Sequence, residues 1–409
     1  MNQQLTSPAV KPLSKLPLLS DFSSKPLFVG IDMHKLNWQV AVLYQGVVLS
    51  NTSIHGSADK LIHHLHKLYP HALFHCVYEA GCWGFTLCRE LWAAGMNCIV
   101  VNPADIPTTN KDTRAKTDQV DARKLAQHHS AGLLLPIHVP SEALQKQRSL
   151  IRFRKKLWKD LVRSKNRLKS QLCFQGISIP PQFDNPHWSR NFLQWIREQA
   201  HHDELLSDTL LLMLEQVIAL RALMLQVEKK LRELMRSAAF KSRSELLLSI
   251  PGVGPLTAML FLLEVGDVSR FKSFDELNRF VGFCPDSHSS GSTERQTGLS
   301  TRGHSQLRSQ LVEAAWQLIR KDMAMLEDYK LLCKRMDGQH AIIRIARRLL
   351  RRMRAVLVSA KPYLKGISGA VRADDIEVPA PPAVVVAPKV KGRPRRSESL
   401  ATAGLRGAD

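Results

Sequence analysis

The chain has 409 residues, enough for two or three domains that each bury a core. Lys and Arg number 58 against 36 Asp and Glu, a formal net charge of +22. Such an excess predicts a polyanionic partner, nucleic acid rather than a membrane. No uninterrupted apolar run of about 18 residues and no signal-peptide pattern is present, so we expect neither a membrane span nor secretion. The seven cysteines are scattered without zinc-type spacing, which favours a reduced, cytoplasmic protein.

The N-terminal part predicts an α/β domain over residues 27–140, preceded by a disordered lead-in over 1–26. Apolar runs predict strands at 27–32, 38–44, 47–50, 73–78 and 98–101, and helical spacing predicts helices at 57–68, 85–94 and 117–129. Three consecutive strands followed by alternating helices and strands favour a mixed sheet with helices on its faces.

The rest of the chain predicts mainly helix. Residues 141–240 hold two long helical stretches, the first strongly basic, which would form a helical hairpin or coiled-coil arm, or equally a plain bundle. Residues 241–364 are helical around a Gly/Ser-rich centre, predicted as a loop. Residues 365–409 are a low-complexity basic tail, predicted to be disordered.

Four carboxylates form the first candidate site. Asp32 and Glu79 each close a predicted strand, and Asp118 and Asp121 lie three apart on one face of a predicted helix. Acids gathered in so basic a protein need a counter-charge, and Mg²⁺ prefers oxygen ligands. Two such ions could support phosphoryl transfer. Any one of these acids alone would be read as a cap or a surface residue.

A glycine turn and an arginine-rich helix form candidate contacts to nucleic acid. Gly252 and Gly254 precede a helix in Pro-Gly-Val-Gly-Pro, a pattern whose backbone N–H groups can hold a phosphate, although an ordinary helix–helix turn is the alternative. Helix 341–357 carries six arginines between apolar residues, Arg347 and Arg351 among them. We expect its basic face to contact nucleic acid.

A serine-rich loop forms the third candidate. Ser289 and Ser290 precede a glycine, and Arg302 and Arg308 follow downstream, where they could clamp a phosphate. A serine hydroxyl becomes a nucleophile only when a base or a cation assists it. Composition alone favours an ordinary loop.

Together these motifs resemble the DEDD transposases of the insertion-sequence one-ten family. The similar segments are FVGIDMHK (28–35), YEAG (78–81), KTDQVDARKLA (116–126), PGVGP (251–255), FVGFCP (280–285), SSG (289–291) and TRGHSQLR (301–308). They follow the order of the family over residues 27–360.

The resemblance implies a RuvC-like N-terminal domain with a ribonuclease-H-type sheet, in which Asp32, Glu79, Asp118 and Asp121 bind Mg²⁺. It implies a C-terminal transposase domain in which Ser290, or failing that Ser289, attacks DNA and forms a phosphoserine link. It further implies a coiled-coil dimerisation arm, dimers that assemble into tetramers, a non-coding bridge RNA that selects DNA, and a cytoplasmic location with the bacterial nucleoid.

The sequence departs from the family pattern at three positions, and two other functions stay open. Phe283 stands where leucine is usual, and Arg302 and His304 stand where Lys and Asn are frequent. These changes keep charge or polarity, so we expect activity. The enzyme alternative is a metal-dependent Holliday-junction nuclease without a covalent intermediate. The non-enzyme alternative, a nucleic-acid-binding regulator, is disfavoured because a pure binder gains nothing from acids that repel phosphate.

Overall fold

A computed structural model describes residues 21–107, 117–185, 187–201, 204–290, 293–300 and 302–364, with no description of the side chains of 202–206 or 285–297. The chain divides into two compact units between Ser141 and Glu142, and each is described by itself. Most of the predicted lead-in and the whole predicted tail lie outside the described residues.

The first unit contains a five-stranded mixed sheet of order β3-β2-β1-β4-β5. Its strands are β1 (Pro26–Met33), β2 (Asn37–Tyr44), β3 (Val47–His55), β4 (Leu73–Glu79) and β5 (Asn97–Val101). Its helices are α1 (Ala58–Leu68), α2 (Thr86–Ala93), the short 3-10 turn η1 (Pro103–Asp105) and α3 (Asp118–Ser130). β1 to β3 pair antiparallel, and β4 and β5 continue from β1 in parallel, which confirms the predicted mixed sheet.

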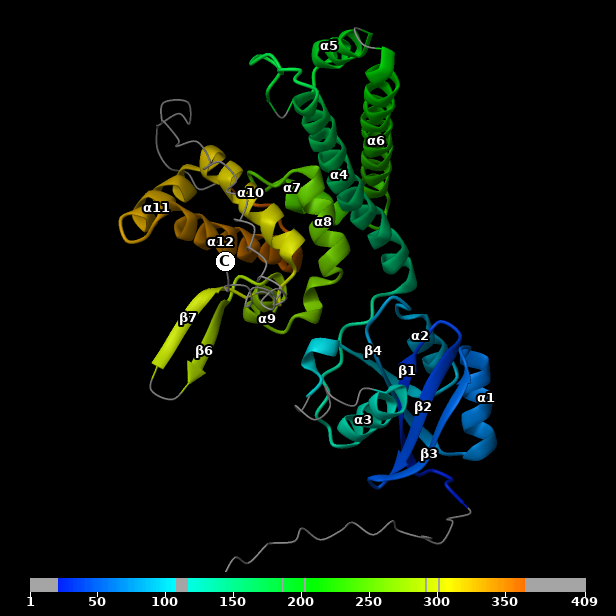
Figure 1. Cartoon of the computed structure of the whole chain (residues 1–409). Helices are drawn as coiled ribbons and strands as arrows, with labels where there is room; N and C mark the ends of the chain where they lie inside the picture. Colours follow the sequence, from blue (N-terminus) through cyan, green and yellow to red (C-terminus); the bar gives the residue numbers. More distant parts are fainter. Residues whose placement is uncertain are drawn as a thin grey trace, which may run out of the picture. The chain divides into compact units, whose positions relative to one another are not determined.

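Helices cover both faces of this sheet (Figure 1). α1 and α2 pack on the face that presents Val29 and Ile31, and α3 packs on the opposite face. The opposite face approaches α3 so closely that a Cβ atom on Gly30 would lie 2.0 Å from the carbonyl oxygen of Ala122. Only glycine allows this contact between strand and helix backbones, and it fixes how deep α3 sits on β1.

The second unit is mainly helical, as predicted. Its helices are α4 (Glu142–Phe174), α5 (Arg190–His201), α6 (Glu204–Arg236), α7 (Lys241–Leu248), α8 (Pro255–Val265), α9 (Phe274–Val281), α10 (Ser305–Lys321), α11 (Met323–Cys333) and α12 (Gly338–Ser359). It also contains the 3-10 turn η2 (Val268–Arg270) and a two-stranded hairpin, β6 (Pro285–Ser290) and β7 (Thr293–Leu299).

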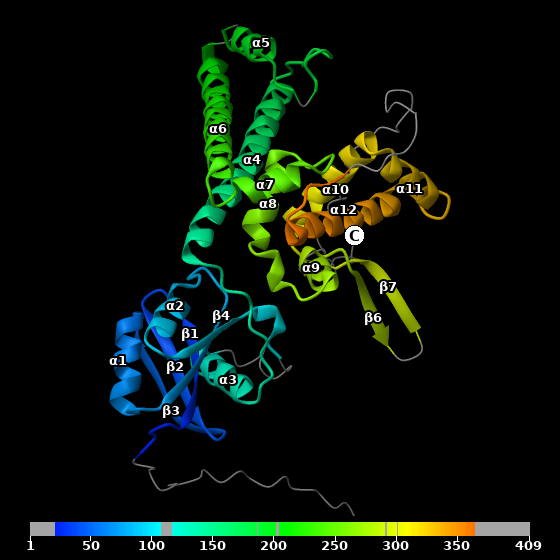
Figure 2. The ribbon, with the colours of Figure 1, turned by 180° about the vertical axis from the view of Figure 1, so that it is seen from behind.

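α4 and α6 lie side by side as an antiparallel pair with α5 at their far ends, a helix that the sequence patterns did not predict (Figure 2). Leu168 of α4 shares a buried cluster with Leu214 of α6 near those ends. The part of α6 from Ser207 to Arg236 is long and apolar enough by composition to cross a membrane, a test that the core helix of a soluble protein also passes. Its buried leucines account for part of that apolar content, since they serve the protein's own core.

Candidate functional site

The carboxyl edge of the sheet brings together the ends of β1 and β4. These strands are parallel, with Ile31 opposite Tyr78, so Asp32 and Glu79 are the next residues at the same edge. Side chains alternate between the faces of a strand. Val77 clusters with Leu125 of α3, so Glu79, two residues later, is directed to the α3 face. Gly30 meets α3 in the same way, which directs Asp32 there too.

The N-terminal turn of α3 brings the other two acids to this edge. Asp118 is exposed and Asp121 is half-buried, and both lie in the first turn. A chain of hydrogen bonds fixes this turn. The Gln39 side chain donates to Asn51 Oδ1 at 2.7 Å, and Asn51 Nδ2 donates to the Gln119 carbonyl at 3.0 Å. A negative charge here also suits the positive end of the helix dipole.

Asp32, His34 and Asp118 form a compact cluster at the edge. His34 Nε2 lies 3.2 Å from Asp32 Oδ2 and 3.3 Å from Asp118 Oδ2. One possible ligand atom from each residue lies within 4.8 Å of the others. Carboxylate oxygens with one imidazole suit a divalent cation. The structure therefore brings two of the four predicted acids into contact with His34, which was not predicted, and holds Asp121 and Glu79 at the same edge.

The electrostatics of Asp32 favour the binding of a cation. Burial raises the pKa of Asp32, and the charges of Asp118 and Asp121 raise it further, while His34 opposes them. Such a group gains most from a cation that neutralises it. His34 was missed as a site residue because its only signal is its position two residues after a strand-closing aspartate.

The predicted serine loop is instead an antiparallel hairpin. Ser289 pairs with Glu294, and Ser290, the last residue of β6, pairs with Thr293. The expectation of an irregular loop was wrong because this polar run gives no apolar alternation, and backbone pairing alone identifies the strands. Ser290 thus stands at the tip of a ribbon, where its side chain lies outside the described part of the structure.

Both legs of the hairpin are held at its base. Arg308 donates from Nη1 to the carbonyl oxygens of Gly282, at 2.9 Å, and Ser300, at 2.7 Å. The Ser300 N–H donates to the Cys284 carbonyl at 3.0 Å. A Cβ atom on Gly303 would lie 2.3 Å from the Gly282 Cα. The predicted phosphate clamp Arg308 is therefore engaged with the backbone, where it ties the two legs together.

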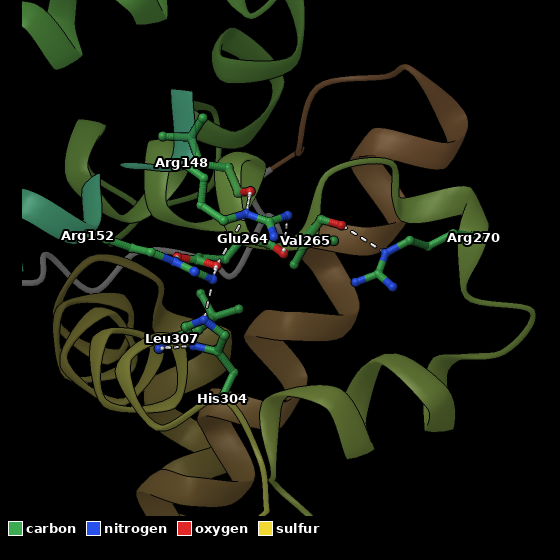
Figure 3. A network of polar contacts seen from close by, with 8 residues as sticks. Arg148, Arg152, Glu264, Val265, Arg270, His304 and Leu307 are labelled. Atoms are coloured by element: carbon green, nitrogen blue, oxygen red, sulfur yellow. Dashed lines mark hydrogen bonds and ion pairs between the residues drawn. The ribbon is translucent and has the colours of Figure 1, made fainter. Parts of the chain in front are cut away.

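A buried carboxylate connects the hairpin exit to α4 (Figure 3). Glu264 is 2% exposed, and Arg152 donates to both its oxygens at 2.8 Å. His304 Nε2 lies 3.3 Å from Glu264 Oε2, while His304 Nδ1 caps α10 by accepting from the Leu307 N–H in its first turn. Burial would raise the pKa of Glu264, but Arg152 and His304 outweigh it and lower the pKa to about 2.

The predicted glycine turn has one packed and one open glycine. Gly252 has φ +86°, and a Cβ atom there would lie 2.6 Å from the Ala314 carbonyl oxygen in α10. Gly254 caps the N-terminus of α8 and has open space around its Cα. Gly252 thus serves close helix packing, and Gly254 is the position that a phosphate could approach.

The predicted arginines are exposed at the surface of the second unit. Arg347 and Arg351 both lie over the Phe274 ring, at 5.9 and 4.7 Å from its centre, and Arg347 also approaches Asp275 at 3.5 Å. Arg302 is exposed beside the hairpin base. These side chains can neutralise phosphates without reading bases.

Comparison with known proteins identifies this combination of an acidic sheet edge and a helical second unit. Residues 29–175 match a family described as transposase, of the DEDD type, and residues 244–330 match the transposase family IS116/IS110/IS902. The y4qE protein of Sinorhizobium fredii is 30% identical over 71% of this chain and 71% of its own length. A transposase for insertion sequence element IS1533 from Leptospira borgpetersenii is 29% identical over 72% of this chain and 85% of its own length.

A third relative has a name other than transposase. The pilin gene-inverting protein of Moraxella bovis is 32% identical over 31% of this chain and 40% of its own length.

The two family matches and the first two relatives show that the chain is an enzyme of the DNA transposase class. It belongs to the IS116/IS110/IS902 family of transposases, which confirms the resemblance found in the sequence. DNA is its partner, and divalent metal use follows from the DEDD type.

Proposed function

We propose that this transposase cuts and rejoins DNA through a serine nucleophile, with a divalent metal held by a RuvC-like domain. The observation that carries the proposal is the cluster of Asp32, His34 and Asp118 at the carboxyl edge of a mixed sheet. Asp121 and Glu79 lie at the same edge and would complete the acidic set. Mg²⁺ is the ion that we expect, because carboxylate oxygens dominate the ligands.

The chemistry needs no external energy source. The Ser290 Oγ attacks a DNA phosphorus, the bond from phosphorus to one deoxyribose oxygen breaks, and that oxygen leaves with a proton as a hydroxyl group. A hydroxyl of the incoming strand then attacks the phosphoserine and restores the serine. One phosphodiester replaces another, so bond energy is conserved. A bound divalent ion would neutralise the phosphate and stabilise the charge of the leaving oxygen.

The site is divided between the two units of the chain, and we propose that subunits share it. Acids of one RuvC-like domain would act with the Ser290 hairpin of another subunit in a dimer that assembles into a tetramer. The α4–α6 pair would be the coiled-coil dimerisation arm. Leu212 and Leu225 of α6 support this because they are 66% and 64% exposed.

We also propose that a non-coding bridge RNA selects the DNA. The net charge of +22 supports binding of more than one nucleic acid. Gly254, Arg302, Arg347 and Arg351 would contact phosphates on the second unit, with Gly252 and Arg308 holding the surrounding backbone. Such an enzyme would work with the bacterial nucleoid in the cytoplasm.

The experiment is an excision assay in cells that carry the open reading frame with its native flanking DNA. Sequencing of the circular junction compares the wild type with Asp32→Ala, Ser290→Ala and Ser289→Ala. We expect loss with the first two variants and retention with Ser289→Ala. Full activity of Ser290→Ala together with Ser289→Ala would refute a serine nucleophile.

A nuclease of the Holliday-junction type is the second candidate. One observation favours it: the acidic cluster lies wholly within the first unit and needs no residue of the hairpin. In that case Asp32→Ala abolishes cleavage, Ser290→Ala does not, and no DNA becomes covalently attached to the protein on denaturing gels.

A further inference from the structure

An exposed tryptophan lies beside the acidic cluster. Trp83 is 40% exposed and follows Glu79 in the loop after β4. Its indole N–H donates to the Met33 carbonyl at 3.0 Å. Met33 stands between Asp32 and His34, so this bond attaches the ring to the segment that carries the cluster.

The loop holds this ring in one place. The hydroxyl of Tyr78, which is 1% exposed, donates to the Gly84 carbonyl at 3.1 Å. The Gly84 N–H donates to the Gly81 carbonyl at 3.3 Å, and the Ala80 N–H donates to the Val101 carbonyl at 2.8 Å. These bonds fix the loop on both sides of Trp83, so little ordering of the ring remains to be done when a ligand binds.

The ring does not serve the protein's own core. Within the described residues, Trp83 belongs to none of the hydrophobic clusters, whereas Leu87 and Leu91 of the following helix do. A large, fixed and exposed aromatic surface at the edge of a reaction site indicates a stacking contact. Lys35, exposed in the turn after His34, adds a cation to the same edge.

We propose that Trp83 stacks on an unpaired DNA base next to the phosphate held at the acidic cluster. The inference rests on the proposed function, because it takes the cluster as the phosphate site. A base within a duplex is covered on both faces by its neighbours, so an indole stacks most readily on a base that has left the duplex. The inference is therefore that the DNA strand at this site is locally single-stranded and that Trp83 is a substrate-positioning residue that holds it so.

Trp92 offers a matched control. It is 47% exposed, and its indole N–H donates to a backbone carbonyl, that of Cys98, at 2.9 Å. Cys98 lies near the start of β5, which runs parallel to β4, so Trp92 stands at the opposite edge of the sheet. The two residues share type, exposure and bonding and differ in their distance from the acids.

The test uses single-stranded DNA of the element's end with 2-aminopurine placed at successive positions, and full-length protein in Ca²⁺ at fixed salt. Stacking quenches the fluorescence of 2-aminopurine, so we expect quenching at one or two positions with the wild type. This quenching should be lost with Trp83→Ala and kept with Trp83→Phe and Trp92→Ala. Affinity should fall on the order of tenfold in Trp83→Ala. An abasic nucleotide at the quenched position should remove this difference between wild type and Trp83→Ala.

Equal quenching and affinity in Trp83→Ala and Trp92→Ala would overturn the inference. So would a Trp83→Ala effect that persists with the abasic strand, because that would indicate a change in fold. DNA cleavage by Asp32→Asn in Mg²⁺ separates the stacking hypothesis from the metal-site hypothesis. If Asp32→Asn does not cleave DNA while Trp83→Ala quenches and binds like the wild type, only the stacking role fails. If Asp32→Asn still cleaves DNA, the proposed metal site is refuted.

Discussion

Carboxylates occur in two contrasting settings in this transposase. At the sheet edge, Asp32 shares its surroundings with Asp118 and Asp121, and the His34 imidazole contacts Asp32 and Asp118. In the second unit, Glu264 is buried and bonded by Arg152 and His304. The pKa of Asp32 is raised, whereas that of Glu264 is lowered to about 2.

The contrast separates a site that needs a ligand from one that the chain completes itself. Negative charge at an accessible edge gains from a cation that arrives from solution. A buried carboxylate with its own arginine has already been neutralised, so it supports the fold around the hairpin. Three variants, a pH series and one metal experiment test this distinction.

The largest effect should follow removal of charge at the sheet edge. Asp32→Asn should lower excision on the order of a thousandfold, because metal ions supply several kcal/mol to such reactions. Its free energy of unfolding should stay equal to that of the wild type or rise, since repulsion among the acids is relieved. Junction sequencing and urea unfolding measure the two quantities. Asp59→Asn, at an exposed position in α1, is the control. A destabilised Asp32→Asn would contradict this view.

Removal of the buried charge of Glu264 should, in contrast, lower the stability of the protein. Glu264→Gln should lower the free energy of unfolding by about 3–5 kcal/mol, because Arg152 and Arg148 lose their partner. Glu142→Gln breaks an exposed pair with Lys146 and should cost less than about 1 kcal/mol. Urea unfolding followed by circular dichroism compares them. Equal losses in the two variants would show that Glu264 is not the support that its contacts indicate.

The pH dependence refines the same comparison. The pKa of Glu264 falls from 4.5 to about 2 on folding, so its contribution is complete above pH 4.5 and is lost as the pH falls towards 2. The stability gap between wild type and Glu264→Gln should therefore narrow between pH 4.5 and pH 3. Urea midpoints at pH 6, 4.5 and 3 measure the gap, and a constant gap would rule out a lowered pKa.

A change of packing should disturb the edge without touching Glu264. Gly30→Ala forces a Cβ atom against the Ala122 carbonyl and should cost about 1–3 kcal/mol while displacing Asp118. Gly81→Ala meets nothing within 4 Å and serves as the stability control. Thermal unfolding and excision should both decline in the first variant. If Gly30→Ala unfolds like Gly81→Ala, α3 is not held as closely as described.

Binding of the metal alone should also change the stability of the protein. Mg²⁺ or Mn²⁺ at about 100 times its dissociation constant stabilises by about 2.7 kcal/mol, which raises Tm by several degrees. Glu264→Gln should keep this increase and Asp32→Asn should lose it. Differential scanning calorimetry with and without the metal measures both. A shift retained in Asp32→Asn would place the metal elsewhere.

The sequence predicted the mixed sheet well because strands depend on local pattern, while the role of its acids stays a prediction. Apolar runs that end in Asp32 and Glu79 predict strands, which the structure pairs in parallel, and the spacing of Asp118 and Asp121 predicts one helix face. The boundaries of the domains stay predictions.

Other features depend on contacts between distant residues. The hairpin that carries Ser290 is polar between Pro285 and Leu299, so only backbone pairing reveals it. The sequence alone cannot say whether Arg308 binds a phosphate or backbone carbonyl groups, because its charge is the same in both cases. Its hydrogen bonds in the structure show that it binds two backbone carbonyl groups. His34 belongs to the cluster because the fold places α3, with Asp118, beside it, and the sequence pattern does not indicate this contact.

The antiparallel pair of α4 and α6 has a consequence for scale. Each helix has 33 residues, and at 1.5 Å per residue each extends about 50 Å. Duplex DNA rises about 3.4 Å per base pair, so the pair is as long as about 15 base pairs. Removal of two helical turns from both helices would shorten it by about 11 Å, the length of about three base pairs. The length of the α4–α6 pair is therefore comparable to a short stretch of duplex DNA, and it can be changed by engineering in steps of one helical turn.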